Sequence, residues 1–340
     1  MTKEKARKLF EEEVSAISVQ QMEKLTKYMF VEQFEYLTQQ FCGCFKDYCQ
    51  KIVQMQQAGE KGSLGYIHFS LLYTDILARN YQLRIDAYDK NWYSDRVECI
   101  GTYDVGDMCL FLDEFTDILL AERKKYVFSV SEADVKQLVI EESVKYRAAI
   151  IGLIRQVFYQ TDLASVFQEV LREDLFIISV GDFQDASTIV YKEDRNPKEA
   201  KDIKELLGEK QEVGHTYEVF EHLDLSGSKF QNLNLAYSSG EGSDFSNSNF
   251  QNARILFCKF PQAVFKQVNF SEAFLLGTDF SGATLEDVDF RDTKLYLVSF
   301  ENATLINVDF SKAEAMAQIN LTNATLINTI IPIPSEEVVS

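Results

Sequence analysis

The chain has 340 residues, and its 53 acidic and 34 basic side chains give a formal charge of −19. At this length two domains are expected, and a 46% apolar composition provides for hydrophobic cores, which excludes wholesale disorder. The acidic excess argues against direct binding to nucleic acids or anionic membranes, because both require a basic surface. The charged, helix-forming N-terminus is not a signal peptide, and no apolar run reaches the roughly 18 residues of a membrane span. We therefore expect a soluble, cytoplasmic protein.

The first region has the spacing of helices. Residues 4–57 carry apolar side chains at helical intervals, among them Leu25, Phe41 and Ile52. The glycine-rich and charged segment 58–63 ends this pattern.

The six cysteines are too few for a disulfide scaffold and indicate a reducing compartment. Cys42, Cys44 and Cys49 cluster in a helical segment, but their spacing is not a zinc-binding pattern. We interpret them as buried thiols, with metal or redox chemistry as the alternative. The other three stand alone in the sequence: Cys99, Cys109 and Cys258.

Strands and helices alternate in the next part of the chain. Residues 81–88 alternate polar and apolar, which predicts a half-buried strand, and its partner is expected near residues 66–73. Helices are predicted over 107–125 and from Ser131 to Phe158, the second beginning with a capping-box pattern.

Two further strands and a short helix complete this region. Strands are expected over 175–180 and 188–191, and a helix that begins after Asn196-Pro197 ends at Gly208. We therefore predict a mainly helical domain with a few strands over residues 1–210, and a linker over 211–218.

The segment 86–95 is rich in polar and aromatic side chains and holds the only tryptophan. One interpretation is a recognition loop. The other is a turn at the end of a strand, with the tryptophan as an anchor in the core. The residues of the candidate loop are Asp89, Asn91, Trp92 and Tyr93.

Signals for catalysis are weak. His215 and His222 lie at or next to the linker, where capping or solvated roles are expected. His68 lies in a strand-like run and has the chemistry of a base or ligand, but no second histidine or matched carboxylate is near it in sequence. Motifs for zinc proteases, serine hydrolases, phosphate loops and dinucleotide binding are absent from the sequence. The sequence therefore predicts no catalytic residue, no metal and no cofactor.

From Leu225 to Phe310 a large apolar residue recurs at every fifth position, with an interruption at Gly240. A small or β-branched residue, such as Ala263 or Thr278, lies two positions before each of them. Neither the helical period of 3.6 nor the strand period of 2 produces this pattern. It requires a backbone that turns a corner every five residues and points two side chains of each five inward.

A four-sided coil of about twenty residues per turn would satisfy this pattern, with turns about 4.8 Å apart. Residues twenty apart would then stack, and the sequence sorts phenylalanines into two opposite columns. One column is Phe230, Phe250, Phe270, Phe290 and Phe310, and the other is Phe260, Phe280 and Phe300.

The coil is expected over residues 219–332, with a tail over 333–340. The hexapeptide at 302–307 returns at 323–328, a displacement of 21 residues, so we expect one extra residue within 315–321. Pro332 and Pro334 end the pattern.

The repeating unit, as in 288–292 and 308–312, resembles the pentapeptide-repeat proteins over about a third of the chain. The resemblance implies a right-handed quadrilateral β-helix, so the fold class is an α+β two-domain chain with a mainly helical N-terminal domain followed by this solenoid. Some members of the family mimic duplex DNA and bind DNA gyrase or topoisomerase IV.

Acidic side chains form outward columns on the predicted coil, and they are the candidate protein-binding face. Basic residues interrupt these columns, with Lys266 below Glu286, and the alternative is an ordinary solvated surface. The acidic charge is also spread over both domains. The candidate residues are Asp244, Glu272, Asp279, Glu286, Asp287, Asp289, Asp292 and Asp309.

Three functional hypotheses follow from these patterns. The first is a non-enzymatic interaction scaffold, in its sharpest form an acidic DNA mimic that binds a type II topoisomerase. The second places a partner-binding or regulatory function in the N-terminal domain, with the coil as a rigid spacer. The third is an enzyme on that domain. The apolar stretch 327–333 further predicts that the C-terminal end of the coil is capped by the tail or forms a homodimer, and the other end is expected to lie under the N-terminal domain.

Overall fold

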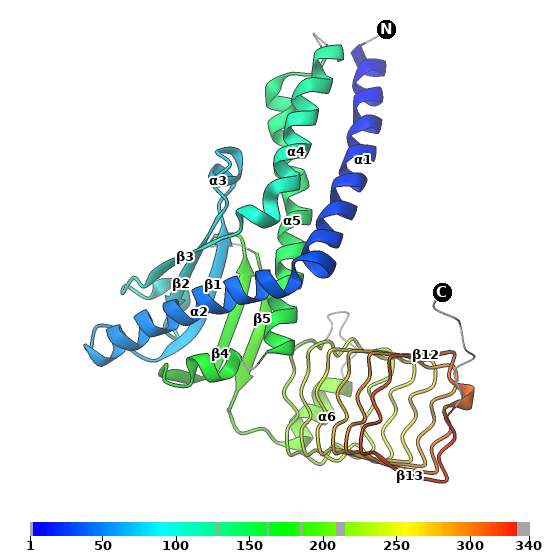
Figure 1. Ribbon diagram of the computed structural model, residues 1–340. Coiled ribbons are helices and arrows are strands. Elements are labelled where there is room, and N and C mark those ends of the chain that lie inside the picture. The colour runs from blue at the N-terminus through cyan, green and yellow to red at the C-terminus, as the bar shows by residue number, and fades with distance from the viewer. Residues whose placement is uncertain (1–2, 127–128, 162, 184–185, 209–214, 332–340) are drawn as a thin grey trace. The chain divides into compact units, whose positions relative to one another are not determined.

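The computed structural model describes residues 3–126, 129–161, 163–183, 186–208 and 215–331. The chain divides into two compact units, Met1–Arg195 and Asn196–Ser340, which are described separately below. Figure 1 shows the first unit in blue to green and the coil of the second in yellow to red. The predicted α+β class, with helices and a sheet before a parallel-strand solenoid, is confirmed.

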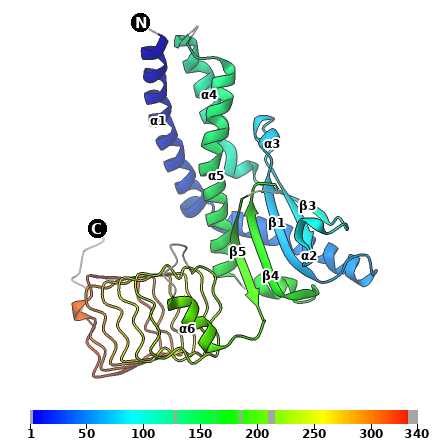
Figure 2. The same ribbon diagram turned by 180° about the vertical axis from the view of Figure 1, so that it is seen from behind.

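Four long helices form most of the first unit. They are α1 (Lys3–Lys27), α2 (Phe34–Gln57), α4 (Gly106–Glu122) and α5 (Glu132–Gln160). Helices α1, α4 and α5 lie side by side in Figures 1 and 2, and a π-helical turn at Tyr28–Glu32 joins α1 to α2. The capping box predicted at the start of α5 is present, with Ser131 and Asp134 satisfying each other's backbone N–H groups.

A five-stranded sheet completes the first unit, in the order β3-β2-β1-β4-β5. Its strands are β1 (Leu64–Leu71), β2 (Gln82–Tyr88), β3 (Ile100–Asp104), β4 (Arg172–Gly181) and β5 (Ser187–Asp194). Strands β1 and β2 pair antiparallel, from Tyr66 opposite Tyr88 to Leu71 opposite Leu83, as the alternation predicted. Strand β3 and the parallel pairing of β1 with β4 were not predicted.

Short elements connect these strands and helices. A five-residue helix, α3 (Tyr73–Leu77), lies between β1 and β2. Three 3-10 turns follow later in the chain: Trp92–Ser94, Arg123–Tyr126 and Leu163–Phe167.

Aromatic side chains hold α2 and the end of α5 against one face of the sheet. Phe41 of α2 lies with its ring centre 5.7 Å from that of Phe69 in β1, and Phe45 lies 5.6 Å from Phe158 of α5. All four rings are buried. Burying a side chain of this size stabilises a fold by about 1.5–3 kcal/mol, so this cluster anchors the helices to the sheet.

The second unit is the coil, and it begins with α6 (Ala200–Gly208). Two parallel sheets of three-residue strands run along it. One is β6 (Arg254–Leu256), β8 (Phe274–Leu276), β10 (Lys294–Tyr296) and β12 (Ala315–Ala317). The other is β7 (Val264–Lys266), β9 (Thr284–Glu286), β11 (Thr304–Ile306) and β13 (Thr325–Ile327).

The predicted columns of phenylalanine fill the interior of the coil. The rings of Phe250 and Phe270 stack 4.8 Å apart, and those of Phe270 and Phe290 stack 5.3 Å apart. In the opposite column, Phe280 and Phe300 are 5.3 Å apart with nearly parallel rings. Stacking twenty residues apart is therefore confirmed, and the ring separations lie in the favourable range for aromatic pairs.

The small residue of each unit has a function of its own. It points inward, and several of these residues donate a hydroxyl or thiol hydrogen to a carbonyl of the preceding turn. Thr278 donates to the carbonyl of Ile255 at 2.8 Å, and Thr293 donates to that of Phe270 at 2.9 Å. Because these donors are buried, each bond satisfies a polar group that has no access to water.

The coil gains its one extra residue earlier than expected. The bridge between Asp289 and Asp309 still joins residues that are twenty apart, whereas Lys294 pairs with Ala315, twenty-one residues on. The extra residue therefore lies between Asp309 and Ala315, where a 3-10 turn spans Phe310–Lys312, and not within 315–321. After this turn the 21-residue register continues, with Leu305 opposite Leu326.

Helix α6 belongs to the coil, although its sequence placed it at the end of a first domain over 1–210. Its Ile203 and Leu207 are buried in the same cluster as Phe220 and Leu225 of the first turn. An apolar helix face thus packs against the first turn at the N-terminal end of the coil. The compact units separate at Arg195 for this reason. Half of the expected linker, at 211–214, and the tail at 333–340 lie outside the described residues.

Candidate interaction surfaces of the coil

Four of the predicted acidic residues hold corners of the coil. Each lies directly before an inward residue, and its Oδ1 accepts a hydrogen bond from the backbone N–H two residues on, at 2.8 to 3.0 Å. This is the local bond that favours Asp and Asn at turns. The four residues are Asp244, Asp279, Asp289 and Asp309.

Two of these four carboxylates have a lowered pKa, which favours their ionised form. A hydrogen bond from Arg291 lowers the pKa of Asp289, and one from Ser311 lowers the pKa of Asp309. The guanidinium of Arg291 lies 2.7 Å from Asp289, so part of the negative charge of this column is neutralised. The column is therefore less acidic than its sequence suggests.

The other four predicted acids are placed differently. Glu272, Asp287 and Asp292 are exposed and occupy corners with φ between 54° and 61°, in the left-handed region. Glu286 forms an ion pair with Lys266 of the turn below, at 3.1 Å. Three carboxylates thus remain as exposed negative charges that no described cation pairs. Glu272 and Asp292 lie twenty residues apart in one column, and Asp287 lies in another.

A different face of the coil is apolar. In strands β6, β8 and β10 the central residue points inward, so its neighbours point outward. On three turns these outward positions, with the corner residue that follows, carry large apolar side chains: Leu256, Phe257, Phe274, Leu276, Tyr296 and Leu297. We call this the apolar face.

Two basic residues and no acidic ones occupy the outward positions of the apolar face between 254 and 297. The guanidinium of Arg254 lies 6.0 Å from the ring centre of Phe274, at the limit of a cation–π contact. Lys294 pairs with Glu314 of the next turn at 3.2 Å. Leu297 is 52% exposed, which is unusual for a leucine on a surface of otherwise polar repeats.

The apolar face was missed by the sequence analysis, which tested the repeat for inward columns and acidic columns only. The signal is present in the sequence. Tyr237, Phe257 and Leu297 follow one another at intervals of twenty and forty residues, and the rings of Tyr237 and Phe257 stack 5.5 Å apart. Outward apolar residues in register would have identified this face.

The candidate recognition loop in the first unit is tied to the sheet. Trp92 packs edge-on against Tyr66 of β1, with ring centres 4.1 Å apart, and contacts Tyr93 at 4.9 Å. Asp89 accepts hydrogen bonds from the backbone and side chain of Asn91. The loop is therefore an ordered turn after β2, and of the four predicted residues Asn91 is exposed and the other three are half-buried.

A buried ion pair closes the same loop. Lys61 Nζ lies 2.6 Å from Asp95 Oδ2, and the two side chains are 1% and 5% exposed. Asp95 also accepts hydrogen bonds from the backbone N–H groups of Asp89 and Val97. No local sequence pattern indicates this pair, because its members are 34 residues apart.

His68 is buried, and both of its ring nitrogens have partners. Nδ1 lies 2.9 Å from the hydroxyl of Ser179, and Nε2 lies 3.1 Å from the carbonyl of Asp182. Because a carbonyl only accepts, Nε2 carries the proton in this arrangement and Nδ1 accepts from Ser179. Burial lowers the pKa of His68, which favours this neutral form. These bonds give His68 a structural role in joining β1 to β4.

The described residues contain no group of three or more His, Cys, Asp or Glu placed to hold a metal ion. Cys49, Cys99, Cys109 and Cys258 are buried, whereas Cys42 and Cys44 are half-buried. Burial raises the pKa of Cys258 to about 12, so its thiol is unreactive near neutral pH. Over the part of the chain that the structure describes, no helix is both long enough and apolar enough to cross a membrane.

Comparison with known families agrees with the geometry of the coil. Residues 224–255 match a family model for pentapeptide repeats of eight copies, and residues 260–304 match a second model of nine copies. The coil is a pentapeptide-repeat domain. Both matches lie within it. No curated protein matches the sequence of this chain.

Solved pentapeptide-repeat proteins resemble this domain. HetL, involved in the regulation of heterocyst differentiation in the cyanobacterium Nostoc sp. strain PCC 7120, is 16% identical with a TM-score of 0.32, over 33% of this chain and 47% of HetL. Rfr23 from the cyanobacterium Cyanothece 51142 is 20% identical with a TM-score of 0.16, over 27% of this chain and 58% of its own. Full-length QnrB1, a plasmid-mediated fluoroquinolone resistance protein, is 17% identical with a TM-score of 0.16, over 34% of this chain and 76% of its own. This chain thus spans about half the length of HetL.

Proposed function

We propose that this protein is a non-enzymatic scaffold that binds a protein partner, and that the apolar face of its pentapeptide-repeat domain makes the central contact. The observation that carries the proposal is the contrast between faces. Leu276, Tyr296 and Leu297 point outward from neighbouring turns of one face, while polar side chains predominate at the outward positions of the other three. Apolar and aromatic side chains without acidic neighbours are typical of the centre of a protein interface.

The geometry favours this face over the acidic columns as the main contact. Four of the eight predicted carboxylates are engaged at corners, and Glu286 is paired with Lys266. Such groups would have to give up existing partners before binding a basic protein. The apolar side chains would lose only contact with water, and this favours association by about 25 cal/mol per Å² of surface buried.

Substitution within the apolar face tests the proposal. The full-length Leu276→Lys/Leu297→Lys variant is expected to lose the partners that the wild-type chain captures from a bacterial lysate, identified by mass spectrometry. A matched control, Thr284→Lys/Asn307→Lys, places the same charges on a polar face and is expected to retain them. Because charging a buried contact costs at least about 2 kcal/mol, we expect a loss of about 30-fold in affinity. Equal capture by both variants would exclude the apolar face.

A second candidate is the acidic DNA mimic that binds DNA gyrase or topoisomerase IV. It is supported by the three exposed carboxylates Glu272, Asp287 and Asp292. A supercoiling assay with purified gyrase tests it directly, since a mimic inhibits or protects the enzyme in a salt-dependent manner. The triple variant to Gln and Asn would abolish that effect. No effect of the wild-type chain at micromolar concentration would eliminate this candidate.

We further propose that the protein acts in the cytoplasm and forms a homodimer through the C-terminal end of the domain. Leu326 lies in register above the inward Leu305, yet it is 45% exposed because no described turn covers it. Ile330, four residues further along the same turn, is 54% exposed. Light scattering is expected to give twice the chain mass, and Leu326→Glu to give a monomer. A wild-type monomer at high concentration would contradict the dimer.

A further inference from the structure

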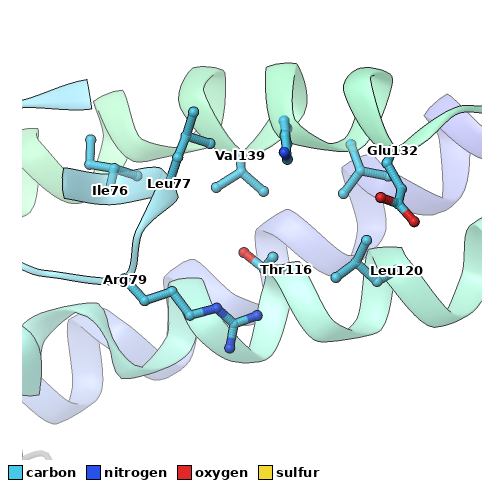
Figure 3. Close-up of a pocket in the computed structure, with 9 residues that line it drawn as sticks. Ile76, Leu77, Arg79, Thr116, Leu120, Glu132 and Val139 are labelled. Carbon is cyan, nitrogen blue, oxygen red and sulfur yellow. The ribbon is translucent and has the colours of Figure 1, made fainter. Parts of the chain in front are cut away.

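A cavity in the first unit lies between α3, α4 and α5, far in sequence from the repeat. It has a volume of about 250 Å³. Figure 3 shows Val139 of α5 and Leu120 of α4 directed into the space between their helices, with Ile76 and Leu77 of α3 at one end. The walls are thus mainly apolar, which is typical of a small-molecule site.

Charged groups surround the mouth of this cavity. Arg79 pairs with Asp117 of α4 at 2.5 Å, and Glu132 pairs with Arg123. Lys136 of α5 also lines the cavity, and within the described part of the chain no carboxylate forms an ion pair with it. The mouth therefore offers one ammonium group that is not already neutralised.

The loop that carries Arg79 is fixed in place. Arg79 has a φ of 55°, a conformation that costs a non-glycine residue about 1 kcal/mol or more. Its guanidinium reaches both Asp113 and Asp117, and Tyr81 donates to Asp113 at 2.6 Å. These contacts hold α3 and the end of the cavity against α4. The cavity is therefore preformed rather than opened by a ligand.

We propose that this cavity binds a small amphiphilic carboxylate, a fatty acid of about eight carbons, with the chain among Ile76, Leu120 and Val139 and the carboxylate at Lys136. At the ~30 Å³ that one water occupies in the liquid, the cavity has room for roughly eight heavy atoms. The remaining atoms of the head group lie at the mouth. The charge of the single unpaired cation matches that of a monocarboxylate.

The proposal is tested by titrating the full-length protein with hexanoate, octanoate and dodecanoate. Binding is monitored by methyl NMR and by calorimetry. Octanoate is expected to shift the methyl signals of Leu120 and Val139. Affinity should rise about fourfold per methylene from hexanoate to octanoate, because each buried methylene adds the same amount to the free energy of binding. It should then level off at dodecanoate, when the cavity is full. Shifts confined to other methyl groups, or no shift at the solubility limit, would overturn the proposal.

Two variants separate the apolar and the charged contributions. Val139→Phe fills the cavity and is expected to abolish octanoate binding while the melting temperature shows that the chain still folds. Lys136→Met, on the exposed surface, should weaken octanoate about two- to fivefold and remove the salt dependence of binding. Lys8→Met on α1 is the matched control and should change neither the affinity for octanoate nor its salt dependence. Octylammonium binding as tightly as octanoate would refute the role of Lys136.

Discussion

Loss of the buried ion pair between Lys61 and Asp95 should strongly destabilise the first unit. Asp95→Asn keeps the shape of the side chain but leaves the Lys61 ammonium buried without a counter-charge. Removing one partner of a buried pair costs about 3–5 kcal/mol, a change of about 10² to 4 × 10³ in the folding equilibrium. Lys61→Met should cost less, because Asp95 retains the backbone N–H groups of Asp89 and Val97.

The assay uses the only tryptophan of the chain as a probe. Trp92 lies in the same loop as Asp95 and packs on Tyr66, so its fluorescence reports unfolding of the first unit alone. Denaturant titration of the full-length chain, read at Trp92, gives the difference in unfolding free energy. The matched control is Glu114→Gln, which breaks the exposed pair with Lys24 and should change stability by no more than about 1 kcal/mol.

The effect of Asp95→Asn should also depend on pH. Burial tends to raise the pKa of Asp95, but hydrogen bonds from Lys61, Val97 and Asp89 outweigh it and leave the pKa below its ordinary value. The stabilisation by Asp95 is therefore present above about pH 4 and is lost as the pH falls through the lowered folded-state value. A loss under about 0.5 kcal/mol at neutral pH, the range of ordinary surface substitutions, would refute the buried pair.

Three substitutions test the packing of the coil, each read by circular dichroism during thermal or denaturant unfolding. Phe270→Ala removes a ring stacked between two others and should cost about 3–5 kcal/mol. Gly240→Ala places a Cβ 2.7 Å from the ring of Phe245, and this overpacking should cost about 1–3 kcal/mol. As a control, Gly43→Ala adds a Cβ where there is open space and should not destabilise the protein. Thr278→Val leaves the buried carbonyl of Ile255 without its donor and should cost about 1–2 kcal/mol. An unchanged unfolding transition would contradict the stacking of Phe270, the close approach at Gly240 or the buried hydrogen bond of Thr278, according to the variant.

The coil was predictable from sequence because its contacts recur at a fixed interval. Every inward side chain meets a residue about twenty positions away, so Phe250 above Phe230 follows from the spacing alone. The extra residue was misplaced by a few positions, since the sequence shows that the register slips but not where the backbone absorbs it. That location is decided by the 3-10 turn at Phe310–Lys312.

The first unit was less predictable because its sheet pairs distant segments. Tyr66 lies opposite Ile177, more than a hundred residues away, and no local pattern carries that information. Helix α6 was recognised but assigned to the wrong neighbour, because an amphipathic pattern does not say which core the apolar face joins. The apolar face and the cavity at Val139 likewise depend on which face of a strand or helix is directed to solvent or to a neighbouring element. Only the packed structure determines this.

The two ends of the coil differ, and this gives the domain a mechanical polarity. Ile203 and Leu207 of α6 close one end, whereas Leu326 is exposed at the other. Turns of a solenoid are held only by their neighbours, so the last one carries the fewest contacts. A pulling force should therefore peel the coil from the C-terminal end, one turn at a time. Each step would release about twenty residues, roughly 70 Å of extended chain. Under load the domain would therefore extend in equal steps, one for each turn that unfolds. The helix α6 at the N-terminal end would unfold last.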